Sequence, residues 1–560
     1  MRRTFRAGVG LLAATLILSG AAPAVAAPAE PASDQVVGGW RPGPIDWQPC
    51  PEVPDDPGVR CATLDLPVDW TRPHGPTFPL AIARRAATGP EPAVGPLLVN
   101  PGGPGGSGVD EVIHLGARFG GEPRYSPELL RRFDLIGFDP RGVARSHPLV
   151  CSTELAYQRP FLIPESEAAY TALVDYNRRL YADCRTRTGP LFDHLDSVDV
   201  AYDMDAVRAA LGARQISYYA LSYGSLIGQM YAEHFPDRVR AMVIDSNMDH
   251  SLGTRDFLRT GAIAVQELFD GFAAWCGRDE RCALHGRDVP ALFDDLVRRA
   301  EAGELVNPDT GAPMHWSELG AQVRSSSFEP LWIMLSNWLA ALVDQTSPTA
   351  AGAVAPRWAL PGTDRTTTTP GTDSTADTTS AEVTENPLLI FCQDFSLPVR
   401  SFAEYSRHLA ELRRIAPQVR ISWLSSLTVG SCMGWPAKAG NPQHRLRVRT
   451  SIPLLVMGVR YDPSTPYQWS VNVAEQLGRH GRLVTYLGWG HGGYNATPCT
   501  GSFVDRYLID RELPPPGATC VGVLDPTPRS QPAGTPSPQR PGSAVPGMPN
   551  PPTWFGRQVG

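Results

Sequence analysis

The stretch Ser217-Tyr-Tyr-Ala-Leu-Ser-Tyr-Gly-Ser-Leu-Ile227 decides how the rest of this chain is interpreted. An apolar run from Ile216 to Ala220 enters the stretch as a buried strand would. Apolar residues then recur at helical spacing, at Leu226, Ile227, Met230 and Tyr231. A strand, a tight turn with a central serine and then a helix is the setting in which Ser222 could act as a nucleophile.

The sharp turn requires small residues two positions before and two positions after the serine, and here these are Ala220 and Gly224. The usual pattern is G-x-S-x-G, from which Ala220 departs by one methyl group. Taken alone, the stretch more often marks a strand-to-helix turn that exposes a hydroxyl group than a catalytic serine. Other parts of the chain must therefore decide between the two interpretations.

The composition limits the classes of protein that need to be considered. The chain has 560 residues, of which 42% are hydrophobic and 19% are charged, enough for about three or four domain-sized units. The net charge is −7 and the basic residues form no stripe, so we expect no nucleic-acid partner. Lys438 is the only lysine, so a Schiff-base or Ser-Lys mechanism would depend on that residue alone.

The N-terminus has the pattern of a secretory signal peptide, which we assign to residues 1–26. Arg2, Arg3 and Arg6 are followed by a short apolar stretch and by the small-residue cleavage site Ala24-Val-Ala26. No later segment is apolar and long enough to span a bilayer, which takes about 20 residues. We therefore expect a secreted protein without stable membrane insertion, with a flexible leader at 27–44.

Ten cysteines in an exported chain indicate disulfides rather than metal ligands, and no C-x-x-C pair occurs. The even number is compatible with complete pairing. Neighbours in the sequence suggest the pairs Cys50–Cys61, Cys151–Cys184, Cys276–Cys282, Cys392–Cys432 and Cys499–Cys520.

Strand and helix patterns alternate along two parts of the chain, 45–248 and 437–522. This alternation predicts an α/β fold with a mostly parallel sheet flanked by helices. Between them, residues 249–436 have a helical and irregular pattern, which predicts a large helical cap with a low-complexity insertion at 361–384. The Pro-rich tail at 523–560 is predicted to be disordered.

A glycine-rich loop, Pro101-Gly-Gly-Pro-Gly-Gly-Ser-Gly108, follows a short apolar strand. Such a loop lets backbone N–H groups approach a ligand, so it could form half of an oxyanion hole. It could also be a phosphate loop or a simple turn, although it lacks the G-K-[ST] of a P-loop. Asp139 and Arg141, after another predicted strand, are interpreted as a structural ion pair that braces their loop.

Two residues in the second part of the chain could act as the acid and the base that Ser222 needs to be a nucleophile. Asp462 follows the predicted strand Ile452–Gly458, and His491 follows the predicted strand Arg482–Leu487. The order Ser, Asp, His is that of the α/β-hydrolases, and the C-terminal ends of parallel strands share one edge of a sheet. We therefore predict that the three residues form a catalytic triad.

Each predicted active-site group has a chemical role. His491 would take the proton of the Ser222 hydroxyl and later give it to the leaving group, and Asp462 would hold the imidazole. Two backbone N–H groups would bind the oxyanion: that of Tyr223, after the nucleophile, and that of Gly103 in the glycine-rich loop.

Several motifs together resemble the secreted tripeptidyl aminopeptidases of actinomycetes, α/β-hydrolases that are related to prolyl aminopeptidases. The motifs are Pro101-Gly-Gly-Pro-Gly105, Asp139-Pro-Arg-Gly142, Ser222-Tyr-Gly224, Ile390-Phe-Cys-Gln-Asp394, Cys432-x-x-Trp-Pro436, Asp462-Pro-x-Thr-Pro466 and Gly490-His-Gly492. The resemblance covers about Trp47 to Cys520. The sequence departs from the pattern at Ala220, at Ala144 where glycine is common, and in the Thr-rich insertion of the cap.

The resemblance implies a peptidase that releases short peptides, specifically tripeptides, from free N-termini of peptides or small proteins. Such an enzyme needs a carboxylate for the substrate ammonium group, and Glu329 and Asp394 in the cap are the candidates. For each of the two, a solvated or locally paired carboxylate is the more common interpretation. We expect no metal or other cofactor, and we expect a monomer.

Two other functions remain open on the sequence alone. The same triad could serve a secreted carboxylesterase or lipase, because a fold does not determine the substrate. A binding protein without catalysis could also use this fold. An epoxide hydrolase or dehalogenase is disfavoured, because those enzymes carry an aspartate where Ser222 stands.

Overall fold

The structure is a computed structural model that describes residues 39–116, 123–308, 311–328, 331–345 and 382–522. The predicted signal peptide, most of the predicted leader and insertion, the Pro-rich tail and Glu329 lie outside these residues.

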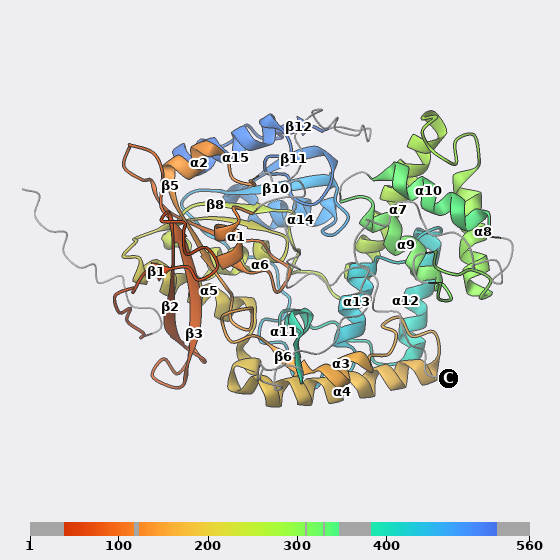
Figure 1. Ribbon diagram of the computed structural model, residues 1–560, viewed down its shortest axis with the longest axis horizontal. Coiled ribbons are helices and arrows are strands. Elements are labelled where there is room, and N and C mark those ends of the chain that lie inside the picture. Colours follow the sequence, from red (N-terminus) through yellow and green to blue (C-terminus); the bar gives the residue numbers. More distant parts are fainter. Residues whose placement is uncertain (1–38, 117–122, 309–310, 329–330, 346–381, 523–560) are drawn as a thin grey trace, which may run out of the picture.

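A single ten-stranded sheet organises the chain and confirms the predicted α/β-hydrolase architecture (Figure 1). Its strands, in spatial order, are β1 (Gln48–Pro49), β2 (Val59–Pro67), β3 (Thr77–Arg85), β5 (Phe133–Phe138), β4 (Gly95–Asn100), β7 (Ile216–Leu221), β8 (Val239–Asp245), β10 (Leu454–Tyr461), β11 (Gly481–Trp489) and β12 (Thr519–Val521). The first three strands pair in antiparallel fashion, and the seven from β5 to β12 are parallel.

The central strands are apolar runs because helices cover both of their faces. All six residues of β7 are buried, which is typical of a parallel strand inside a doubly covered sheet. One face packs against α1 (Gly108–Ile113), α2 (Pro127–Arg132) and α15 (Pro498–Asp510). The other face packs against α5 (Ser197–Ala210), α6 (Tyr223–His234) and α14 (Tyr467–Leu477).

Most of the described residues between β8 and β10 lie in helices, and we call the described residues between 249 and 436 the cap. Its helices are α7 (Thr254–Arg278), α8 (Val289–Glu301), α9 (Trp316–Ser325), α10 (Trp332–Val343), α11 (Phe391–Asp394), α12 (Phe402–Ile415) and α13 (Trp423–Cys432). In Figure 1 the longer cap helices gather on the right, beside the carboxyl ends of the central strands.

A long helix outside the predicted cap also belongs to this layer. Helix α4 (Glu167–Thr188) runs beneath α12 and α13 in Figure 1. The Tyr170 hydroxyl donates to the Val399 carbonyl oxygen at 2.8 Å, and the Asn177 amide donates to the Gly430 carbonyl oxygen at 2.8 Å. The cap therefore rests on a helix that the chain builds before the strand that carries Ser222.

The remaining short elements lie at connections. They are β6 (Val150–Ser152), which pairs with β9 (Val383–Glu385), α3 (Thr153–Tyr157), and the 3₁₀ turns η1 (Gly189–His194), η2 (Pro236–Arg238), η5 (Pro387–Ile390) and η6 (Gly478–His480).

An aromatic stack joins the cap to the sheet. Trp489, at the end of β11, stacks on Tyr461 with ring centroids 4.1 Å apart and meets Trp332 of α10 edge-on at 4.6 Å. A side chain at Gly271 of α7 would lie 2.4 Å from the Trp489 ring, so the glycine makes room for it. Because Tyr461 precedes Asp462 and Trp489 lies two residues before His491, the cap is packed directly on the segments that carry these residues.

Five disulfides are formed, and they are the pairs that the sequence predicts: Cys50–Cys61, Cys151–Cys184, Cys276–Cys282, Cys392–Cys432 and Cys499–Cys520. This complete pairing fits a protein of an oxidising, extracellular environment. In the described part of the chain, no helix combines the length and the apolar character needed to cross a membrane.

Candidate active site

Ser222 occupies a strained turn between β7 and α6. Its φ of 59° and ψ of −127° are unusual for a residue with a side chain, and such conformations cost about 1–3 kcal/mol. The Ser222 N–H donates to the Asp245 carbonyl oxygen at 3.0 Å, and the Ser222 carbonyl oxygen accepts from the Ser225 N–H at 2.9 Å. The surrounding sheet and helix hold the turn in this shape, as expected for a nucleophile elbow.

The substitution of alanine for glycine at position 220 fits this turn. A Cβ atom at Gly224 would lie 2.6 Å from the Asn100 side-chain oxygen and 3.1 Å from the Ala220 methyl group. Position 224 therefore must be glycine, and its missing side chain leaves the room that the Ala220 methyl group occupies.

The glycine-rich loop after β4 packs against the elbow. A Cβ atom at Gly102 would lie 2.3 Å from the Leu221 carbonyl oxygen and 2.9 Å from the Ser222 Cβ atom. The Asn100 side chain fixes the loop by accepting from the Gly102 N–H at 2.8 Å. Only a loop without side chains can approach the serine so closely, which agrees with the predicted role of this segment.

The two predicted oxyanion donors have backbone positions that leave their N–H groups available. Tyr223 is the first residue of α6, and the first N–H groups of a helix lack intrahelical acceptors. Within the described residues, the Gly103 N–H donates to no protein acceptor. Their joint action on an oxyanion stays a proposal.

His491 and Asp462 meet at the same edge of the sheet as Ser222. The His491 Nδ1 atom lies 2.9 Å from Asp462 Oδ1 and 3.0 Å from Oδ2. The strands β7, β8, β10 and β11 are parallel neighbours, so the residues that follow their carboxyl ends lie on one side of the sheet. An imidazole held through Nδ1 keeps Nε2 for a substrate-side proton transfer.

The Asp462 carboxylate is stabilised in its charged form. It is buried and accepts from the backbone N–H groups of Ser464 at 2.8 Å and Thr465 at 2.9 Å, and from the Thr465 hydroxyl at 3.0 Å. Burial alone would raise its pKa, but the contact with His491 and these hydrogen bonds hold the pKa below its ordinary value. Asp462 can therefore stay ionised next to an imidazolium.

Asp245 and Ser246 form a connection that the sequence analysis missed. The Asp245 carboxylate accepts from the N–H groups of Gly493 at 2.8 Å and Tyr494 at 2.9 Å, while its carbonyl oxygen accepts from Ser222. The Ser246 hydroxyl accepts from the Gly492 N–H at 2.9 Å and helps to lower the pKa of the nearby Asp462. The sequence could have indicated this role, because Asp245 and Ser246 lie at the carboxyl end of a buried strand, and that strand lies between those that lead to Ser222 and Asp462.

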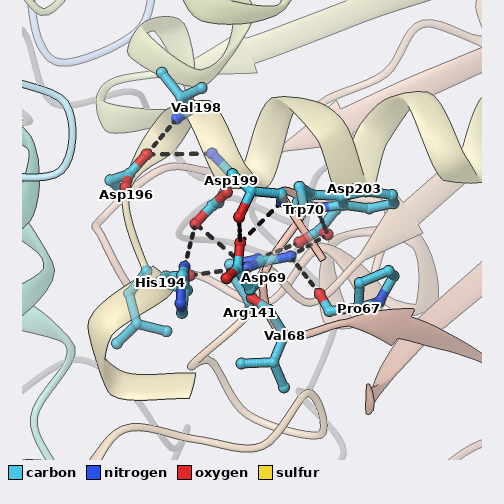
Figure 2. A network of polar contacts seen from close by, with 12 residues as sticks. Pro67, Val68, Asp69, Trp70, Arg141, His194, Asp196, Val198, Asp199 and Asp203 are labelled. Carbon is cyan, nitrogen blue, oxygen red and sulfur yellow. Dashed lines mark hydrogen bonds and ion pairs between the residues drawn. The ribbon is translucent and has the colours of Figure 1, made fainter. Parts of the chain in front are cut away.

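The predicted ion pair between Asp139 and Arg141 is wrong, because each residue has another partner. Figure 2 shows Arg141 at the centre of a polar network, where its guanidinium donates to Asp203 at 2.7 and 2.6 Å. Arg141 also donates to the carbonyl oxygens of Val68 and His194. Asp139 instead accepts from Arg145 at 3.1 Å and from the Ser107 hydroxyl. Both networks brace loops around the site, so the structural interpretation holds with different partners.

Asp394, one of the two candidates for the substrate ammonium group, is fully buried. Its carboxylate accepts from the Ser197 hydroxyl at 2.6 Å, from the Asn441 amide at 3.1 Å and from the Tyr223 hydroxyl. Burial raises its pKa. These internal partners leave it closed to a substrate amine, so the structure favours the interpretation as a locally paired carboxylate, here one that anchors the ring of Tyr223.

Comparison with known families agrees with this architecture. Residues 95–310 match the α/β hydrolase fold family, and residues 417–520 match the TAP-like protein family. A relative from Mycobacterium tuberculosis, named serine protease Hip1, is 32% identical over 500 residues, which cover 85% of this chain and 91% of the relative. The chain belongs to the TAP-like α/β-hydrolases.

Other relatives of this chain carry different names. The tripeptidyl aminopeptidase of Streptomyces lividans is 28% identical over 509 residues, covering 86% of this chain and 88% of that protein. Carboxylesterase B of Mycobacterium tuberculosis is 31% identical over 530 residues, covering 90% and 96%. All three names describe hydrolases, and one of them names a serine protease. This TAP-like chain is a serine hydrolase.

Proposed function

We propose that this TAP-like protein is an exported serine exopeptidase that releases short peptides, specifically tripeptides, from free N-termini. The observation that carries the proposal is the bond between His491 and the buried Asp462, beside the strained turn of Ser222. The names of the serine protease and aminopeptidase relatives support peptides as the substrate class. The five disulfides support export.

In the proposed mechanism, His491 removes the proton of Ser222 as the serine oxygen attacks the carbonyl carbon of the scissile peptide bond. The N–H groups of Tyr223 and Gly103 bind the oxyanion of the tetrahedral intermediate. His491 then protonates the leaving amine, and an acyl-enzyme forms on Ser222. Water attacks this ester with the help of His491, which releases the N-terminal tripeptide and restores the serine.

A pair of matched substrates tests the exopeptidase part of the proposal. We expect the enzyme to release p-nitroaniline from a tripeptide p-nitroanilide with a free amine and to leave the N-acetylated twin largely uncleaved. The reason is that an exopeptidase must bind the ammonium group at a closed end of its cleft. Equal cleavage of both substrates, or cleavage of p-nitrophenyl esters only, contradicts the exopeptidase proposal.

The second candidate is a secreted carboxylesterase, which the relative named carboxylesterase B favours. The same Ser222, His491 and Asp462 chemistry would act on an ester carbonyl. The ratio of kcat/KM for a tripeptide p-nitroanilide to that for its p-nitrophenyl ester separates the two candidates. A non-catalytic protein is separated from both by a fluorophosphonate probe, which labels Ser222 only if the serine is activated.

A further inference from the structure

Arg324 brings a positive charge from the cap to the segment that carries Asp462. It lies in the last turn of α9, where its Nε group donates to the Pro463 carbonyl oxygen at 2.8 Å. One Nη group donates to the Ser464 hydroxyl at 2.8 Å. The guanidinium also lies 4.8 Å from the centre of the Phe328 ring, which meets the His491 ring edge-on at 5.9 Å. The Phe328 ring therefore lies in contact with both the Arg324 guanidinium and the ring of His491, the proposed catalytic base.

No carboxylate of the described residues lies within ion-pair distance of Arg324, whereas other internal arginines do form ion pairs. Arg141 is paired with Asp203 at 2.6 Å, and Arg124 is paired with Glu111 at 3.1 Å. Burial of the guanidinium lowers the pKa of Arg324 to about 10, and the nearby Asp462 only partly opposes this effect. The Asp462 carboxylate itself is already occupied by His491 and by its own loop.

The simplest interpretation is that Arg324 only clamps the cap to the loop after Asp462. Both acceptors in this clamp are uncharged, and a neutral amide could serve them. A guanidinium has five N–H donors, of which the clamp uses two. Among the described residues the other three donors have no acceptor, and Arg324 is half-buried rather than enclosed. This surplus favours a role toward an anionic ligand.

The position beside His491 determines which part of a substrate would meet this cation. In a serine hydrolase the histidine gives its proton to the leaving group, so the leaving group must lie next to the imidazole. The planar guanidinium matches the two oxygens of a carboxylate. We propose that Arg324 binds a carboxylate on the leaving-group side of the scissile bond, such as the free C-terminal carboxylate of a short peptide.

The peptide form of this inference rests on the proposed exopeptidase function, whereas the carboxylate site requires only serine hydrolase chemistry. Two substrate pairs therefore test it in the full-length protein. One pair is a tetrapeptide as its free acid and as its C-terminal amide. The other is 4-acetoxybenzoate and its methyl ester, which differ in the charge of the leaving group. The measured quantity is the ratio of kcat/KM for the charged substrate to that for the neutral one.

We expect the Arg324→Met substitution to lower this ratio about tenfold, mainly by raising KM for the charged substrate. Comparing the same ratio between variants cancels the intrinsic reactivity of the two leaving groups. Arg324→Lys keeps the charge without the planar fork and should lower the ratio less. Arg460→Met is the matched control, because Arg460 lies beside the same loop but is already paired with Glu267 at 2.6 Å. This control should keep the wild-type ratio.

An unchanged ratio in Arg324→Met, with Ser222 still labelled by an uncharged fluorophosphonate, would overturn the inference. If Arg324→Met does not fold, the kcat/KM ratio of charged to neutral substrate is compared between Arg324→Lys and Arg460→Met instead. If these two variants have the same ratio, the carboxylate site is rejected. If neither tetrapeptide is cleaved while the ester pair responds to Arg324, the exopeptidase proposal fails and the carboxylate site stands.

Discussion

The replacement of Asp462 by asparagine is the most informative perturbation of the proposed triad. The substituted side chain can keep one oxygen toward the N–H groups of Ser464 and Thr465, which now bond to Oδ1 at 2.8 and 2.9 Å. Its NH₂ group would then replace Oδ2, the oxygen that accepts from the Thr465 hydroxyl. This amide would donate toward His491 Nδ1, which lies 3.0 Å from Oδ2.

A donor facing Nδ1 forces the imidazole proton onto Nε2, where the base should be unprotonated. In a serine protease with the same arrangement, this exchange lowers kcat about 10⁴-fold. At about 1.36 kcal/mol for each factor of ten, the expected loss is roughly 5.5 kcal/mol of transition-state stabilisation. The N–H groups of Tyr223 and Gly103 are unaffected, so residual activity should remain.

The assay is kcat for p-nitrophenyl ester and tripeptide p-nitroanilide substrates, with thermal unfolding as the control for folding. In the wild-type protein the low pKa of Asp462 contributes stability that is present above about pH 4 and is lost as the pH falls through that pKa. The Asn variant should lack this contribution. If it keeps the wild-type kcat at neutral pH, Asp462 is not the partner of the catalytic base.

Three further predictions concern the residues around the site. Ser222→Ala and Ser222→Gly should both abolish turnover and fluorophosphonate labelling. The Gly variant should have a higher Tm than the Ala variant, because glycine tolerates a φ of 59°. Equal Tm values for the two variants would speak against backbone strain at this position. Gly102→Ala should remove activity, since its Cβ atom would lie 2.3 Å from the Leu221 carbonyl oxygen, while Gly277→Ala, whose Cβ atom meets nothing within 4 Å, should retain it in the same kinetic assay. Burial and the nearby Asp199 and Asp394 raise the pKa of Asp196 to about 7, so the stability associated with its protonation is fully present below about pH 4 and is lost as the pH rises through 7. Asp196→Asn, which can still cap α5, should therefore flatten the fall of Tm between pH 5 and pH 8, and an unchanged pH profile would refute the shift.

Much of the sheet could be predicted from the sequence, because parallel strands buried on both faces are apolar runs. The predicted strands at Ile216–Ala220 and Ile452–Gly458 correspond to β7 and β10. The cap was harder to predict. Helix α13 contains Ser425, Ser426 and Thr428, which are weak helix formers, and it exists because it packs against α7 and α4.

The candidate site likewise contains residues that the sequence pattern predicts and contacts that depend on tertiary packing. Ser222, Asp462 and His491 could be found because each follows a strand and the order of the three is informative. The partners of Asp139 and Arg141 could not be found. Asp203 reaches Arg141 from helix α5, 62 residues further along the chain, and Arg145 reaches Asp139 only because the backbone of their own loop turns back. The closure of Asp394 behind Tyr223 depends on Ser197 and Asn441, which are far from it in the sequence.

The central claim is that acyl transfer through Ser222 removes short peptides from free N-termini. The most direct measurement is a time course by mass spectrometry of an unblocked decapeptide incubated with the wild-type protein and with Ser222→Ala. The account predicts that the wild-type protein releases the first tripeptide and then the next, and that the Ala variant releases none. Cleavage at internal bonds, equal cleavage of the N-acetylated decapeptide, or release by the Ala variant would contradict it.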